Sequence, residues 1–165
     1  MARLSVTIEL SDIRSSRPRA VLLGEPLRQA AAAERHVTTQ RHAGGTVRVT
    51  TLERTLVDVL DVPGKAGGWE EVWRSLEMVE FFDLDAVTSY AAKLGSALTA
   101  ARVGFFLEQR RDALMVEDKH LDRLRRLRPR QPRYLDVRRT PGKLVTSWNL
   151  IVPDDVLGRT WADVA

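Results

Sequence analysis

Hydrophobic and polar positions follow two different periods along this chain, and each period predicts one kind of secondary structure. Residues 3–10 alternate apolar and polar side chains, which is the pattern of a half-buried β-strand. A short apolar stretch at 20–24 predicts another strand, and the alternating residues 46–50 predict a third. The alanine-rich residues 26–35 predict a short helix. We therefore expect strands and one short helix up to residue 50.

From residue 51 onward, apolar residues recur at every third or fourth position, and this spacing predicts a series of helices. Thr50 and Glu53 fit a capping box at the start of the first helix, in which each side chain bonds the other residue's free backbone amide. Asp83 is the expected cap of the third helix, Gly95 its expected end, and Ser96 the expected cap of the fourth.

The last part of the chain returns from helix to strand. We expect the fourth helix to continue to about residue 115 and the fifth to occupy about 118–128, where leucine is the only apolar residue type. Strands are expected at 133–138 and 143–152. In the last strand four residues are expected to share one face: Leu144, Trp148, Leu150 and Val152.

Strands, then helices, then strands indicate an α+β fold. We expect a small, mostly antiparallel sheet, built from the N- and C-terminal strands, to pack with a central bundle of about four to five helices. The 165 residues are expected to form a single domain. Its parts are the strands and short helix of 1–50, the helices of 51–128 and the strands of 133–152.

Composition agrees with a cytoplasmic globular protein. The chain is 44% hydrophobic, which is enough for a core, yet its apolar runs are far shorter than the roughly 20 residues that cross a membrane. The first residues show no apolar signal-peptide segment. The absence of cysteine excludes disulfides, thiolate zinc sites and cysteine nucleophiles. We therefore expect a cytoplasmic protein without membrane association.

Positive charge is concentrated in residues 119–139. This segment holds nine basic residues against two acidic ones, a net charge of +7, which leaves −3 for the rest of a chain whose total is +4. Such a cluster fits phosphate groups, which attract cations without demanding fixed spacing. An acidic protein, or simply a solvated face, are the alternatives. The candidate binding residues are Lys119, Arg123, Arg125, Arg126, Arg128, Arg130, Arg133, Arg138 and Arg139.

A search for catalytic and metal-binding patterns finds none, so we expect no enzyme and no cofactor. His36, His42 and His120 lack nearby ligands in the sequence, and we expect them to lie on the surface. Trp69 and Trp73 are spaced to face the same side of a helix, where core packing is preferred to a partner-binding patch.

One stretch resembles a known family. Residues 47–68 resemble the segment of AbiEi-family proteins in which a strand leads into a "P-E-R-T-L-[LV]-D" helix and then a glycine turn, although Leu52 replaces the usual proline. Residues 84–109 resemble a second family pattern that ends in "R-L-G-Y-L-L-E". The motif residues, which we interpret as mainly structural, are Glu53, Arg54, Thr55 and Asp58.

The resemblance implies the C-terminal domain of an antitoxin and transcriptional regulator from a type IV toxin–antitoxin system of phage defence, without the family's usual N-terminal winged helix-turn-helix. It implies a functional partner, a cognate nucleotidyltransferase toxin, and support for DNA binding. The basic segment is expected to bind DNA or RNA weakly, and a homodimer is possible. A nucleotide-handling enzyme and a dimerisation domain of a truncated DNA-binding protein are the alternatives.

Overall fold

The structure is a computed structural model that describes residues 36–42 and 44–158. The strands expected at 3–10 and 20–24 and the helix expected at 26–35 lie outside the described residues. The strands are β1 (Val37–His42), β2 (Gly45–Thr50), β3 (Arg133–Tyr134), β4 (Lys143–Val145) and β5 (Leu150–Val152). The helices are α2 (Leu52–Asp61), a 3-10 turn η1 (Pro63–Lys65), α3 (Trp69–Glu77), α4 (Leu84–Leu94), α5 (Ala97–Gln109), α6 (Asp118–Arg125) and α7 (Asp154–Gly158).

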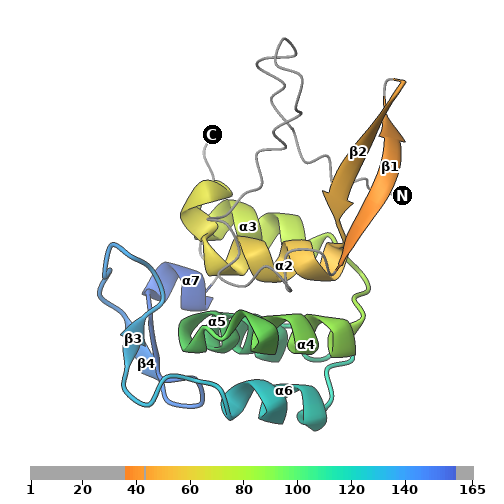
Figure 1. The fold of residues 1–165 in the computed structure, drawn as a ribbon. Coiled ribbons are helices and arrows are strands. Elements are labelled where there is room, and N and C mark those ends of the chain that lie inside the picture. Colours follow the sequence, from red (N-terminus) through yellow and green to blue (C-terminus); the bar gives the residue numbers. More distant parts are fainter. Residues whose placement is uncertain (1–35, 43, 159–165) are drawn as a thin grey trace.

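The helices form the body of the molecule, and α5 lies at its centre. Helices α4 and α5 lie between α2 and α6 and contact both (Figure 1). The residues of α5 from Thr99 to Leu107 are all buried, because α5 is covered on several sides by its neighbours. Trp73 of α3 packs against Phe105 and Phe106, with ring centroids 5.8 and 5.2 Å apart. Trp69 and Trp73 are both buried, so their predicted place in the core is confirmed.

Most helix ends fall where the capping residues predict them. The side chain of Asp83 accepts a hydrogen bond from the amide of Ala86, and Gly95 ends α4 in the left-handed conformation with φ of 66°. Ser96 then caps α5. The first cap is corrected by one position, because Thr51 and not Thr50 accepts from the amide of Arg54.

Two further helix ends fall earlier than expected. Helix α5 stops at Gln109, and the backbone up to residue 115 forms hydrogen-bonded turns that end at Met115, where φ is 53°. Helix α6 stops at Arg125, followed by turn residues and then Pro129. Apolar spacing does not distinguish such turns from a helix, because turns can place side chains on the same side.

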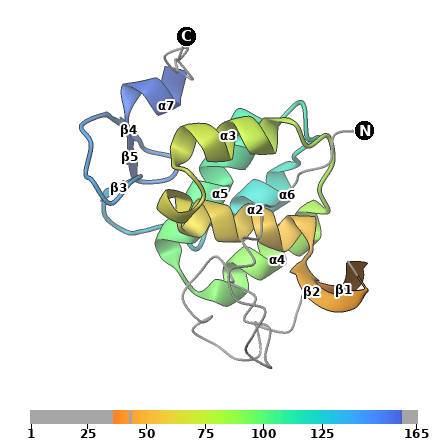
Figure 2. The ribbon, with the colours of Figure 1, turned by 90° about the horizontal axis from the view of Figure 1, so that it is seen from above.

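The α+β class predicted from the sequence is confirmed, but the strands of the described residues form two sheets rather than one. Strands β1 and β2 form an antiparallel hairpin at one end of the helical body, and the second sheet lies at the opposite end (Figures 1 and 2). The second sheet has the order β3-β5-β4, in which β3 pairs with β5 in parallel and β4 with β5 antiparallel.

The strand predicted at 143–152 is a hairpin instead. A turn separates β4 from β5, and Asn149, with φ of 52°, lies at its end. Leu144 is therefore 48% exposed, whereas Trp148, Leu150 and Val152 are buried, so the expected common face of these four residues is wrong. The strand expected at 133–138 is likewise shorter and consists of Arg133 and Tyr134.

Candidate functional site

The motif residues of α2 form a buried polar cluster with α4. Arg54 is 2% exposed, and its Nε donates to Asp58 Oδ2 over 3.2 Å. The hydroxyl of Tyr90 donates to the other carboxylate oxygen of Asp58 over 3.0 Å. The Arg54 guanidinium also lies 5.5 Å from the centre of the Tyr90 ring. One helix turn spaces Arg54 and Asp58 so that both reach Tyr90, and the cluster thereby joins α2 to α4.

Burial changes the acid–base behaviour of this cluster. Burial raises the pKa of Asp58 above its usual value, and the hydrogen bonds from Tyr90 and Arg54 oppose this only in part. Burial and the nearby Asp58 carboxylate also raise the pKa of the Tyr90 hydroxyl, which stays protonated and keeps its role as a donor. The cluster is thus a structural joint in which each polar group has a partner inside the protein.

The other motif residues also make internal contacts. Glu53 accepts a hydrogen bond from the amide of Asp83 over 3.4 Å, which links the start of α2 to the start of α4. The Thr55 hydroxyl donates to the carbonyl of Thr51 over 2.9 Å and lies 2.7 Å from the hydroxyl of Thr50. These contacts fix the joint between strand β2 and helix α2.

The second family pattern, residues 84–109, covers α4 and α5, and its part in α5 connects that helix to distant parts of the chain. Arg102 is buried and donates to the backbone carbonyls of Leu60, Asp61 and Leu135. Burial lowers the pKa of Arg102, although the carboxylates of Asp61 and Asp136 oppose the shift. Two residues later, Gly104 leaves room for Trp148, whose ring would overlap a Cβ atom at that position. Arg102 and Gly104 therefore hold the second sheet against α5.

Glu108 connects α5 to both α6 and the second sheet. Its carboxylate accepts hydrogen bonds from Trp148 Nε1 over 2.8 Å and from Ser147 over 3.2 Å. It also pairs with Arg125 over 2.8 Å, and the Arg125 guanidinium lies 5.5 Å from the centre of the Trp148 ring. Arg125, a predicted binding residue, is thus mainly occupied inside the molecule.

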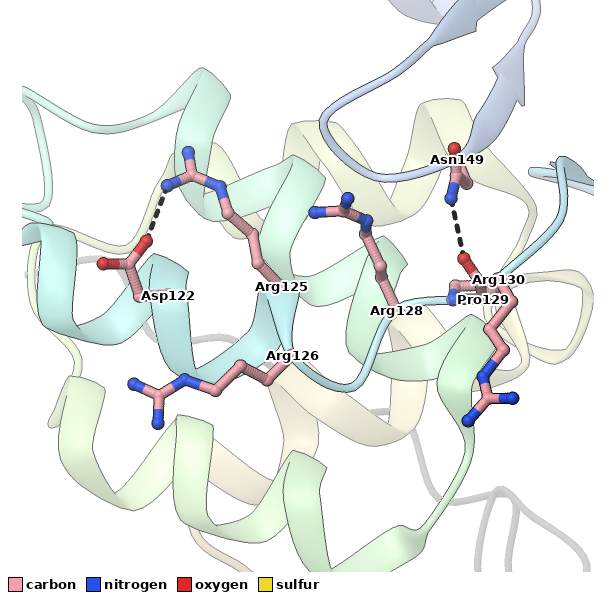
Figure 3. A pocket seen from close by; sticks show the side chains of 7 residues that line it. All are labelled: Asp122, Arg125, Arg126, Arg128, Pro129, Arg130 and Asn149. Carbon is pink, nitrogen blue, oxygen red and sulfur yellow. Dashed lines mark hydrogen bonds and ion pairs between the residues drawn. The ribbon is translucent and has the colours of Figure 1, made fainter.

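A shallow open pocket of about 540 Å³ lies where α6 ends. It is lined by Asp122, Arg125, Arg126, Arg128, Pro129, Arg130 and Asn149. Figure 3 shows Arg125 turned toward Asp122, with an ion pair of 2.9 Å, while the guanidinium groups of Arg126, Arg128 and Arg130 are held apart from that pair. No carboxylate among residues 36–42 and 44–158 pairs with these three arginines.

The backbone of the pocket is held by Asn149, which is not among the predicted binding residues. Asn149 donates through its side-chain amide to the carbonyl of Pro129 over 2.8 Å, and its own carbonyl accepts from the amide of Arg133 over 2.9 Å. These bonds tie the segment after α6 to the turn before β5. The alternation of apolar residues predicts the burial of its neighbour Trp148. No periodic pattern, however, indicates an asparagine that adopts a positive φ.

Only some of the nine predicted binding residues line this pocket. Four of them line the pocket: Arg125, Arg126, Arg128 and Arg130. Five others are exposed but do not line it: Lys119, Arg123, Arg133, Arg138 and Arg139. Among these five, Lys119 pairs with Glu117 over 3.0 Å. Three of the four pocket arginines, Arg126, Arg128 and Arg130, thus line the pocket without a carboxylate partner among the described residues.

One histidine departs from its expected surface position. His120 is 5% exposed, and its Nδ1 accepts from the amide of Glu117 over 3.2 Å at the start of α6. His120 therefore caps α6, a role that the sequence around this histidine did not indicate. In the described part of the chain, no three His, Asp or Glu side chains come together in a way that could hold a metal ion.

Comparisons with protein-family models, curated proteins and solved structures found no match to this chain. None of the helices in the described residues is long and apolar enough to span a membrane.

Proposed function

We propose that this chain is an antitoxin and regulator domain of the AbiEi type, a binding module and not an enzyme, that uses the arginine pocket to bind a polyanion. The observation that carries the proposal is the group of three arginines, Arg126, Arg128 and Arg130, around an open pocket without carboxylate partners among the described residues. In this proposal it acts in the cytoplasm against a nucleotidyltransferase toxin.

The chemistry of the pocket supports a phosphate ligand. Guanidinium groups are planar and bind phosphate oxygens through two parallel hydrogen bonds. Arginines that emerge from a helix end and an adjoining extended segment can contact successive phosphates, because phosphate binding depends on clustered charge. A nucleotidyltransferase binds a triphosphate and commonly a nucleic-acid acceptor, so a cationic surface can compete for that acceptor.

The internal contacts of the motif residues support the same assignment indirectly. Arg54, Asp58, Arg102 and Glu108 all have partners inside the protein, so these residues maintain the fold. Among the described residues, the side chains of Arg126, Arg128 and Arg130 have no ion pair of this kind. We therefore place the partner-binding role on them.

Co-expression with the cognate nucleotidyltransferase toxin tests the proposal. We expect the wild-type chain to restore growth and the triple reversal Arg126→Glu, Arg128→Glu and Arg130→Glu to fail, because the pocket then repels phosphate. A matched control reverses three exposed arginines outside the pocket, Arg123, Arg138 and Arg139, and should still restore growth.

Circular dichroism must show that both variants fold, since only then does growth report on the surface. Growth rescue by the pocket variant would refute the pocket as the effector. Equal loss in the two variants would mean that total charge matters and not the pocket. Absence of rescue by the wild-type chain would refute the antitoxin assignment itself.

A further inference from the structure

The β1–β2 hairpin is anchored at its base but takes no part in the hydrophobic core of the described residues. It projects from one end of the helical body (Figure 1). The amide of Thr51 donates to the carbonyl of His36 over 2.7 Å, and the His36 ring packs edge-on against Tyr90 with centroids 5.6 Å apart. An isolated two-stranded ribbon is marginally stable in water. Its position suits a contact outside the molecule better than a contribution to stability.

Past the Val37–Thr50 pair at the base of the hairpin, one face carries only side chains that can form hydrogen bonds. The register places Thr39 opposite Arg48 and Arg41 opposite Thr46. Opposed residues point to the same side of a ribbon, and so do alternate residues along a strand, so all four share one face. All four are exposed. The two arginines are diagonal neighbours, which are about 7–8 Å apart in antiparallel pairs.

The opposite face has a different character. It carries Thr38 and Gln40 together with Val47 and Val49, and both valines are only half exposed. The hairpin is therefore two-sided, with a mixed face and a wholly polar one. Because the four residues of the polar face are exposed, packing among the described residues does not explain their choice.

Charge gives a reason for this choice. Residues 36–50 contain two arginines and two histidines and no acidic residue. Neither Arg41 nor Arg48 has an ion pair with any residue that the structure describes. The face formed by Thr39, Arg41, Thr46 and Arg48, hereafter the arginine–threonine face, is thus purely cationic and rich in donors.

We propose that the β1–β2 hairpin is a second nucleic-acid contact, separate from the arginine pocket, that inserts its arginine–threonine face into the major groove of duplex DNA. The major groove is about 12 Å wide and admits a two-stranded ribbon, whose strands are about 4.8 Å apart. Arginine binds the O6 and N7 atoms of guanine through two hydrogen bonds, and threonine bonds base edges or phosphates. The deep, narrow major groove of duplex RNA excludes such side chains, so DNA is the preferred duplex.

Guanine methylation tests the insertion directly, because dimethyl sulfate attacks N7 in the major groove. The full chain is mixed with a short duplex DNA of mixed sequence at low salt, and affinity is measured by fluorescence anisotropy. We expect the wild type to protect guanine N7. The double variant Arg41→Ala and Arg48→Ala should lose this protection and bind at least about ten- to a hundredfold more weakly, the range for loss of a single bidentate arginine–guanine contact.

The matched control changes the other face of the same hairpin. The double variant Thr38→Ala and Gln40→Ala should keep both protection and affinity. The pocket variant Arg126→Ala, Arg128→Ala and Arg130→Ala should keep N7 protection at low salt, which separates this inference from the proposed function.

Three results would overturn the inference. The first is a wild-type chain that leaves guanine N7 unprotected. The second is equal loss of protection in both hairpin variants, since the hairpin would then matter only through its fold. The third is equal affinity for an RNA duplex of the same sequence, which would indicate phosphate contacts alone.

Discussion

The buried arginines of this chain need fixed hydrogen-bond acceptors inside the protein, whereas the exposed arginines do not. A buried charge without a partner costs several kcal/mol, so Arg54 and Arg102 each require fixed acceptors. Arg54 has the carboxylate of Asp58, and Arg102 has backbone carbonyls from two distant segments. Arg126 and Arg128 remain in water and carry no such demand. Net charge alone therefore says little about which arginines bind a partner.

Gly104 shows how one missing methyl group can decide packing. We expect Gly104→Ala to lower the free energy of unfolding by about 1–3 kcal/mol, the range for overpacking a core. The reason is that a Cβ atom there would overlap the Trp148 ring. The loss should appear although alanine favours a helix over glycine by about 1 kcal/mol. Urea unfolding followed by circular dichroism measures it.

Gly64→Ala is the control, because a Cβ atom at this exposed position meets no atom within 4 Å. We expect its effect to stay within about 0.5 kcal/mol, as for other surface substitutions. Equal effects of the two substitutions would show that Trp148 does not restrict position 104.

The raised pKa of Asp58 predicts a defined pH dependence of stability. An acid whose pKa is higher in the folded state binds more protons there than in the unfolded state, so its contribution to stability is fully present below the unfolded pKa. That contribution is lost as the pH rises through the folded pKa. We therefore expect the stability difference between wild type and Asp58→Asn to be largest at acidic pH and to shrink toward neutral pH.

Urea unfolding of both proteins at a series of pH values, from below the usual aspartate pKa of about 3.9 upward, checks this prediction. A difference that grows with pH would contradict it. Such growth would mean that the attraction of Arg54 outweighs burial and that the pKa of Asp58 is lowered.

At the scale of elements, capping residues determine where several helices of this fold begin. Thr51, Asp83 and Ser96 each place a side-chain oxygen against a free amide of the helix that follows. In the case of α4, the cap is reinforced from another element, because Glu53 of α2 accepts from the Asp83 amide. The start of α4 is thus held from both sides.

Removal of the α4 cap should have a moderate cost. We expect Asp83→Ala to lower the free energy of unfolding by about 0.5–2 kcal/mol, because an amide of the first helical turn loses its partner. Asp83→Asn keeps the capping oxygen and should behave nearly as the wild type. Thermal and urea unfolding measure both. A similar cost for the two substitutions would show that the negative charge, and not the cap, stabilises α4.

The capped helices and the presence of strands after residue 132 could be predicted from the sequence, whereas the turn between β4 and β5 and the strand order of the second sheet could not. Capping residues act on neighbours within a few positions, so Asp83 and Ser96 identify their helices directly. The hairpin of β4 and β5 depends on Asn149, whose side chain bonds Pro129 far away in the sequence. The same holds for Arg125. The sequence marks it only as one of nine basic residues, whereas in the fold it lies beside Glu108 and Trp148. Long-range contacts of this kind leave no periodic trace.

At the scale of the whole molecule, the net charge is +4, but the basic residues differ in whether they have partners inside the protein. Arg54, Arg102 and Arg125 hold the fold together through internal partners. Arg126, Arg128 and Arg130 of the pocket, and Arg41 and Arg48 of the hairpin's arginine–threonine face, have no carboxylate partner among the described residues. We expect DNA binding to depend on these five arginines, and we expect the exposed Arg123, Arg138 and Arg139, which lie outside both surfaces, to matter less.

Salt dependence of DNA binding by the full chain checks this expectation. Each phosphate neutralised contributes about −0.9 to the slope of log affinity against log salt on duplex DNA. If Arg126, Arg128 and Arg130 each meet one phosphate, their joint replacement by alanine should reduce the steepness of the slope by about 2.7. Replacement of Arg123, Arg138 and Arg139, which are exposed but outside the pocket, should change it less.

We expect wild-type binding to be weak at physiological salt. An unchanged slope in the pocket variant would refute the pocket as a phosphate site. Salt-insensitive wild-type binding would mean that base contacts, such as those proposed for the hairpin, dominate and that phosphate contacts contribute little.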